Sequence, residues 1–282
     1  MPTDAIRTAL ERSGSGLDGQ LASIVAPVGW RRLGAVGIDK ESYGTLRALT
    51  GNRSASRTHL AMRPLHSGDE SIAVERMEPE LPVRYSELGL RECNLPAARL
   101  EQSLRSGLDA LALVPDATLA VSTLVRSVHC LAVEDPDFDA SYSDPEVPFS
   151  IFVGVHGERI RQEALRAAEA ILHETMHLQL SLAEAVVPLV VGSEERWNSP
   201  WQGRPRPVQG VLHGLYVFCA IEDFLERYTA TSMPDTESRA YIGQRLESID
   251  KEIAVLRDLQ SSTELTAAGR VLVGRLLERR TR

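Results

Sequence analysis

The residues with the clearest potential for chemistry are His173, Glu174 and His177, which form an H-E-x-x-H pattern within ILHETMHLQL (171–180). An α-helix places residues four apart on one face, so the two imidazoles can bind one metal ion. Glu174 projects beside them, and in a zinc metallopeptidase it would be the general base that activates water. Apolar neighbours indicate a buried helix, which favours metal binding over two histidines that only hydrogen-bond inside a core.

The third ligand decides which chemistry such a site performs. The extended metzincin motif requires glycine and histidine where this chain has Leu180 and Ala183, which excludes that subclass. Glu184 lies two turns along the same helix, too far to reach round. The remaining candidates are Glu194, Glu195 and Glu222 as carboxylates and His213, in GVLHG, as an imidazole. We favour His213, because two helices joined by an irregular loop can pack antiparallel and place it opposite the first two histidines.

A second motif follows the first. HETMHLQLSLAEAVVPLV (173–190) and SPWQGRPRPVQGVLHGLYVF (199–218) together resemble the HExxH-containing peptide-modification proteins found near ribosomal peptide natural-product genes. That family combines HExxH, an apolar run, a spacer, a segment like S/A-P-W-R-x-D-P-R-P and a G-x-x-x-G helix start. The resemblance covers mainly residues 140–228, and the upstream SYSDPEVPFSIFVGV (141–155) is similar to the family's serine-containing loop and strand. The chain departs from the pattern at Gln202-Gly203-Arg204, where the family more often has Arg-x-Asp.

The resemblance implies a peptide β-hydroxylase that depends on iron(II) and 2-oxoglutarate. By position, iron(II) would be bound by His173, His177 and His213, and the catalytic carboxylate Glu174 would orient substrate or support a ligand. Three neutral imidazoles leave positions for a bidentate 2-oxo acid and for O₂.

The distal carboxylate of 2-oxoglutarate calls for planar, bidentate donors, which arginine supplies better than lysine. Arg206 is the first choice because it lies in the rigid RPRP stretch just before the helix of His213, and Arg204 and Arg126 are the next candidates. Ser141 and Ser143 are candidates to hydrogen-bond the cosubstrate or the peptide. A zinc metallopeptidase with Glu174 as general base remains the alternative.

Composition and charge indicate the class of protein. The chain has 282 residues, 43% of them hydrophobic and 25% charged, as expected of a soluble globular protein. Its net charge of -8 argues against a nucleic-acid partner. Three scattered cysteines without C-x-x-C spacing indicate buried thiols, and neither a signal peptide nor a membrane span is expected. We therefore expect a cytoplasmic protein with a peptide substrate, and its C-terminal helices are a candidate surface for a homodimer or a leader peptide.

Periodicity predicts a mainly α (α+β) fold in a single domain, residues 1–282. Its parts would be an N-terminal helical or mixed region (1–134), a metal-site core (135–230) and a C-terminal helical hairpin (231–282). Helices are predicted at 159–187, 207–229, 236–260 and 263–280, with two more in 3–25 separated at 13–16. A strand is expected at 149–155, a hairpin within 57–78, a loop at 135–148 and an irregular segment at 192–207. Helix and strand stay open for 115–133, where His129 is expected to be a core histidine.

Overall fold

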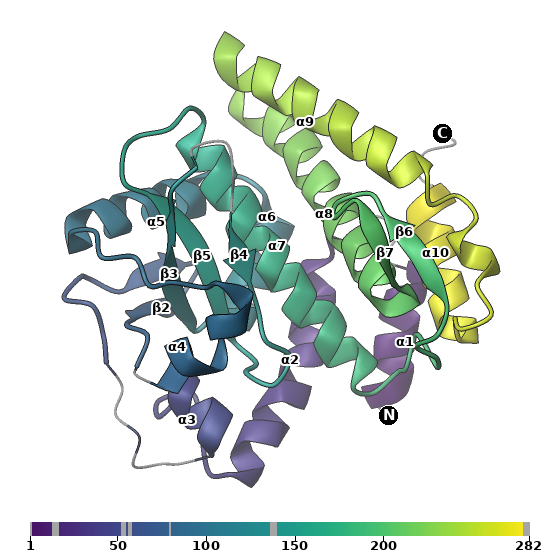
Figure 1. Ribbon diagram of the computed structural model, residues 1–282, viewed down its shortest axis with the longest axis horizontal. Helices are drawn as coiled ribbons and strands as arrows, with labels where there is room; N and C mark the ends of the chain where they lie inside the picture. Colours follow the sequence, from purple (N-terminus) through teal and green to yellow (C-terminus); the bar gives the residue numbers. More distant parts are fainter. Residues whose placement is uncertain are drawn as a thin grey trace.

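The H-E-x-x-H motif lies on α7 (Glu163–Glu184), which runs between a β-sheet and a group of C-terminal helices (Figure 1). The computed structural model describes residues 2–12, 17–51, 55, 58–78, 80–135 and 140–278. Apolar residues recur along α7 at helical spacing and are buried, among them Leu165, Leu172 and Met176. Because α7 packs against α5 and β5 on one side and α8 on another, its histidines are held by a rigid element.

A five-stranded sheet forms one side of the site. Its order is β1 (Leu65–Ser67), β2 (Glu70–Glu75), β3 (Ser127–Val133), β5 (Ser150–His156) and β4 (Ser141–Tyr142). The inner strands β2, β3 and β5 are parallel, whereas β1 and β4 pair antiparallel at the two edges. The predicted hairpin within 57–78 is confirmed as β1–β2, and the predicted strand at 149–155 is confirmed as β5.

The N-terminal half also contains several helices. They are α1 (Pro2–Arg12), α2 (Gly19–Ala35), α3 (Thr45–Thr50), α4 (Glu80–Arg84), α5 (Ala97–Leu111) and α6 (Pro115–Leu124), with a 3₁₀ turn at Ser86–Leu88. Asp18 caps α2 by accepting hydrogen bonds from the backbone N–H groups of Gln20 and Leu21. The segment 115–133 divides into α6 and β3, and His129 on β3 is fully buried, as expected. The predicted break at 13–16 lies outside the described residues.

The segment 208–278 is mainly helical. It contains α8 (Val208–Ser232), α9 (Thr236–Ala254), a 3₁₀ turn at Leu259–Ser261 and α10 (Ala267–Glu278). Both closing helices are confirmed, but the predicted hairpin between them is not, because α9 lies alongside α8 whereas α10 packs against α8 and α1 (Figure 1). By length and composition α8 could cross a membrane, but 72% of its apolar window is buried inside the molecule, as in the core helix of a soluble protein.

One prediction of irregular backbone was wrong, and a second holds for most of its described residues. The segment 192–207 contains an antiparallel pair, β6 (Arg196–Ser199) and β7 (Arg204–Pro207), closed by a turn in which Gly203 has a φ of 59°. The prolines of β7 argued against a strand, because proline has no backbone N–H to donate. Proline is nevertheless tolerated in an edge strand. The segment 135–148 contains β4, while its residues 136–139 lie outside the described part of the chain.

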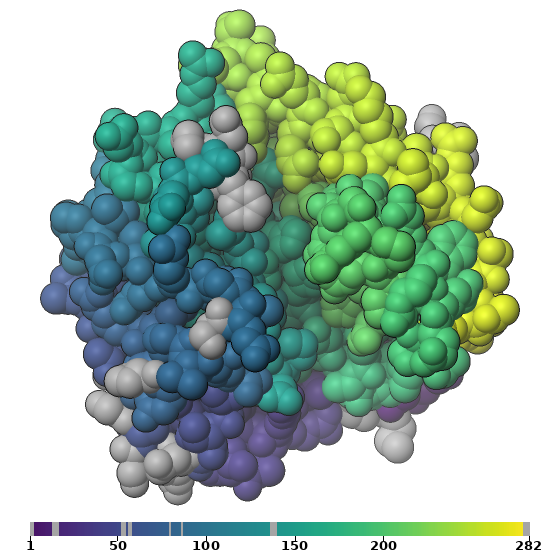
Figure 2. All heavy atoms as spheres, in the orientation of Figure 1, coloured from purple at the N-terminus to yellow at the C-terminus, as the bar shows by residue number. Residues whose placement is uncertain are grey.

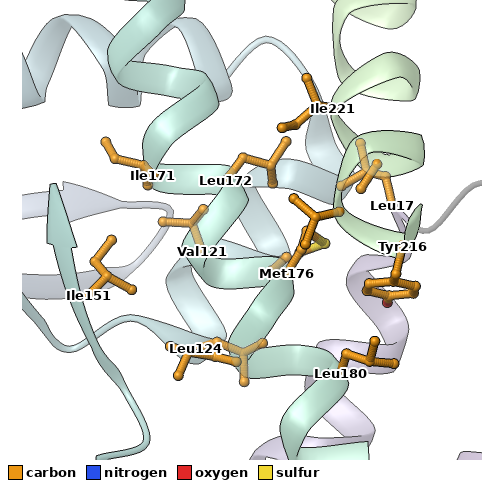
Figure 3. Close-up of a cluster of buried hydrophobic side chains, with 14 of the residues drawn as sticks. Leu17, Val121, Leu124, Ile151, Ile171, Leu172, Met176, Leu180, Tyr216 and Ile221 are labelled. Atoms are coloured by element: carbon orange, nitrogen blue, oxygen red, sulfur yellow. The ribbon is translucent and has the colours of Figure 1, made fainter. Parts of the chain in front are cut away.

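One hydrophobic cluster locks the two helices of the site together (Figure 3). Met176 and Leu180 of α7 lie near Tyr216 of α8 in the same buried group. Within it, Gln179 Nε2 donates a hydrogen bond of 2.6 Å to the hydroxyl of Tyr216. Such a polar contact inside an apolar interface fixes the relative position of α7 and α8, because breaking it would leave buried polar atoms unsatisfied.

Candidate metal centre and cleft

The structure brings all three predicted histidine ligands together. The Nε2 atoms of His173 and His177 are 3.2 Å apart, and the Nδ1 atom of His177 is 3.2 Å from Nδ1 of His213. His173 and His177 lie one turn apart on α7, and His213 reaches them from the first turns of α8. The imidazoles therefore form a row with His177 in the middle.

The first two histidines fit a shared metal ion. With metal–nitrogen distances of about 2.1 Å, two nitrogens 3.2 Å apart subtend about 100° at the ion, between octahedral and tetrahedral values. Burial lowers the pKa of His173 to about 4 and that of His177 well below its ordinary value, so both are neutral ligands at pH 7. His213 faces the other ring nitrogen of His177, and no three His, Cys, Asp or Glu side chains in the described ranges converge as a metal-binding group.

Glu184 has a role that the sequence did not reveal. Its carboxylate oxygen Oε2 is 2.7 Å from His213 Nε2 and also accepts a hydrogen bond from Gln209 Nε2. As expected, Glu184 does not reach round to the first two histidines. It instead fixes the ring orientation of His213, in the manner of carboxylates behind metal-binding histidines.

The other carboxylates considered as third ligands serve different contacts. The backbone N–H groups of Glu194 and Glu195 both donate to Glu264, and the carboxylate of Glu195 accepts from Ser262. These contacts tie the segment before β6 to the segment before α10. Glu222 lies on α8 more than two turns beyond His213.

Glu174 is buried beside His173. Its Oε1 atom lies 3.8 Å from His173 Nε2 and accepts a hydrogen bond of 2.5 Å from the Ser141 hydroxyl. Burial raises the pKa of Glu174 to about 7, although hydrogen bonds from Ser141 and Ser143 act in the opposite direction. Both serines thus contact this carboxylate, which can exchange a proton near neutral pH.

The raised pKa of Glu174 predicts a pH-dependent effect of Glu174→Gln on the metal-free protein. An unfolded chain releases this proton near its ordinary pKa of 4.5, whereas the folded protein keeps it until about pH 7. Stability is therefore lost as pH rises through this window, and an amide removes that loss. We expect the unfolding free energy of the variant, relative to that of wild type, to rise by about 3 kcal/mol from pH 4 to pH 8. Urea unfolding in chelator at both pH values measures it; an identical difference at the two would contradict it.

A cleft of about 1140 Å³ opens next to His173. Figure 2 shows the surface hollowed between the sheet half and the part that carries β6, β7 and the C-terminal helices. The cleft lies at the carboxyl end of β3 and beside the edge strand β4. Its lining includes Ser141, Tyr142, His173, Trp201, Phe218 and Arg245.

An aromatic wall closes one side of the cleft. Trp201 stacks on Phe218 with ring centroids 4.8 Å apart, and His173 meets the same Phe218 edge-on at 5.5 Å. Gly214, one turn before Phe218 on α8, makes room for this wall, because a Cβ atom there would collide with the Trp201 ring. The tryptophan therefore both covers α8 and shapes the approach to His173.

Of the three predicted arginines, Arg206 lies near the histidines, and Arg204 shares its partner Gln202. Gln202 Oε1 accepts hydrogen bonds from Arg204 Nη2 at 3.2 Å and from Arg206 Nη1 at 2.5 Å. The positive charge of Arg206 contributes to the lowered pKa of His177, which places it within electrostatic reach of that imidazole. Gln202, where the chain departs from the family pattern, thus holds both guanidinium groups on β7.

Arg126 lies elsewhere. It precedes β3, whereas the cleft lies at the far end of that strand, about 20 Å away at the rise of an extended chain. It lines a separate cavity of about 530 Å³ together with Lys40 and Glu70. Its guanidinium donates to the carbonyls of Ser122 and Val125, so the structure does not bring it to the histidines.

Comparison with known proteins places the chain in no family, since no protein-family model and no curated protein matches it.

Proposed function

We propose that the protein is an iron(II)- and 2-oxoglutarate-dependent hydroxylase that acts on the β-carbon of a side chain in a peptide, within natural-product modification. The observation that carries this proposal is a neutral histidine pair with arginine charges on two sides, Arg206 near His177 and Arg245 near His173. A dicarboxylic cosubstrate needs cations beside its metal, whereas hydrolysis of a peptide does not require them.

Each residue has a defined task in this proposal. His173 and His177 would hold iron(II) through Nε2. His213 is the proposed third ligand, and to reach the same ion its ring would have to turn away from Nδ1 of His177, which it contacts in the structure. Bound iron with 2-oxoglutarate and O₂ would supply the oxidising power for inserting one oxygen atom into a C–H bond, with succinate and CO₂ as coproducts. Arg206 would pair with the distal carboxylate, held in place by Gln202.

Buried neighbours would control protons and water. Glu174 shares hydrogen bonds with Ser141 and Ser143 and can hold a proton close to His173 at neutral pH. The stacked pair Trp201 and Phe218 would keep solvent from one side of His173, which strengthens electrostatic interactions there.

A peptide is the favoured substrate because of β4. This strand is the antiparallel edge of the sheet, and its residues Ser141 and Tyr142 line the cleft. An edge strand can pair with an extended peptide through backbone hydrogen bonds, which would lay the peptide past His173.

The proposal is tested by anaerobic loading with iron(II), followed by addition of 2-oxoglutarate and oxygen. We expect succinate in amounts that exceed the metal-free control and the His173→Ala variant at least 10-fold, and faster release when a suitable peptide is present. Metal analysis of anaerobically prepared protein should find iron at about one equivalent. No succinate above the His173→Ala background, with or without a peptide library, would refute the proposal.

A zinc metallopeptidase is the second candidate, and the position of Glu174 favours it. This carboxylate lies 3.8 Å from His173 Nε2, and its pKa of about 7 suits a general base. If the protein were a peptidase, Glu174→Gln would lower peptide cleavage by about 100-fold or more. As a hydroxylase, the same variant is expected to keep releasing succinate within about 10-fold of wild type, because Glu174 then binds no metal. Parallel assays of cleavage and succinate separate the two.

A further inference from the structure

Arg245 of α9 occupies a prepared position on the wall of the cleft. Its Nε atom donates a hydrogen bond of 2.8 Å to Glu169 Oε2, and the hydroxyl of Tyr241 donates 2.7 Å to the other oxygen of the same carboxylate. Glu169 lies on α7 one turn before His173 and is 7% exposed. The buried carboxylate therefore fixes one edge of the guanidinium on the helix that carries the metal site.

The opposite edge of this guanidinium is available to a ligand. Across the described part of the chain, neither terminal nitrogen of Arg245 has a hydrogen-bond partner, and the side chain is 25% exposed. The guanidinium carbon lies 5.3 Å from the centroid of Phe218, which restricts its plane. Two parallel donors in a fixed plane match the two oxygens of a carboxylate.

Phe218 also connects this cation to the metal site. His173 contacts the same ring edge-on, with centroids 5.5 Å apart, and Arg245 and His173 both line the cleft. The charge of Arg245 contributes to the lowered pKa of His173, which agrees with their proximity. A group bound at Arg245 would therefore lie on the cleft side of His173, whereas Arg206 acts on the side of His177.

We infer that Arg245, fixed by Glu169 and Phe218, anchors a carboxylate of the ligand that enters the cleft beside His173. The identity of that ligand rests on the proposed function: the carboxylate belongs either to 2-oxoglutarate or to an acidic side chain of the peptide. Anchoring itself requires only the cleft and the cation, so it can be measured without turnover.

Calorimetric titration under anaerobic conditions tests this inference, in chelator and again with Mn(II). The probes are 2-oxoglutarate, succinate, and capped Ala-Asp-Ala and Ala-Asn-Ala peptides. We expect Arg245→Gln to weaken binding of the anchored carboxylate about 10- to 100-fold, and Arg245→Lys to restore part of it. The control is Arg161→Gln, another arginine of the cleft lining, 92% exposed, which should leave affinity within about 2-fold.

The pattern of losses identifies the source of the carboxylate. Weaker binding of 2-oxoglutarate and succinate assigns Arg245 to the cosubstrate, and weaker binding of the Asp peptide alone assigns it to the substrate. The single variant Arg245→Gln leaves the buried carboxylate of Glu169 without its cation, which could destabilise the protein. The double variant Arg245→Gln/Glu169→Gln removes that unpaired charge and provides a second test. Unchanged affinities in both variants, or no binding of any probe to wild type, would overturn the inference. If anchoring is found without succinate release, the inference stands and the proposed hydroxylase falls.

Discussion

Replacing His177 with alanine is expected to weaken metal binding by more than about 100-fold, because even a residue behind a ligand is worth 10- to 100-fold. His177 is the middle of the row, with one ring nitrogen 3.2 Å from His173 and the other 3.2 Å from His213. No other single substitution removes both contacts. Neither iron(II) nor zinc should remain at more than about a tenth of an equivalent after dialysis.

His213→Ala should have a smaller effect on affinity than His177→Ala, because His213 contacts the row at only one point. His66→Ala is the matched control, since this histidine is exposed on β1 at the opposite edge of the sheet from β4. Metal content measured by elemental analysis, together with calorimetric affinity for Mn(II), decides the outcome. A full equivalent retained by His177→Ala would contradict a site on α7.

Two glycines of the C-terminal helices are expected to respond to alanine with opposite signs. At Gly269 in α10, a Cβ atom would collide with the backbone carbonyl oxygen of Leu189, which cannot turn aside. Gly269→Ala should therefore cost about 3 kcal/mol of unfolding free energy or more. At Gly243, exposed on α9, nothing lies within 4 Å of a Cβ atom, so Gly243→Ala should gain about 0.5–1 kcal/mol from helix propensity.

Urea unfolding of the two variants beside wild type measures this pair of effects. The comparison of the two variants is informative because both substitutions add the same methyl group to a helix of the C-terminal region. Equal responses would mean that α10 does not pack on Leu189 as described. The Gly243→Ala protein also serves as a stabilised background for the variants of Arg245, which lies on the same helix.

The helices that carry the metal site could be predicted from local sequence patterns, whereas the contacts around them could not. The spacing of His173 and His177 sets their common face whatever surrounds the helix. The apolar circumference of α8 predicted that it would be buried, which brought His213 close. Arg245 could not be assigned from sequence, because its place depends on α9 packing along α8 and on a carboxylate 76 residues earlier. Only the tertiary structure pairs such distant charges.

Short strands were the least predictable elements. β4 has two residues, too few for an alternating pattern, and its identity comes from pairing with β5. In β7 the prolines at Pro205 and Pro207 argued against a strand, yet the structure tolerates them because β7 has only one partner strand in its sheet. Arg126 shows a related limit, because the sequence does not reveal which end of the sheet faces the metal site.

The row of imidazoles has a fixed direction of donation when each ring is neutral, because a neutral imidazole carries one hydrogen. The carboxylate of Glu184 accepts the hydrogen on His213 Nε2, which leaves Nδ1 of that ring as an acceptor. His177 must then donate from Nδ1, so its Nε2 lone pair is the one that points to His173. A cation held by the Nε2 atoms of these two rings therefore requires only that the hydrogen of His173 move from Nε2 to Nδ1, because His177 and His213 keep their tautomers.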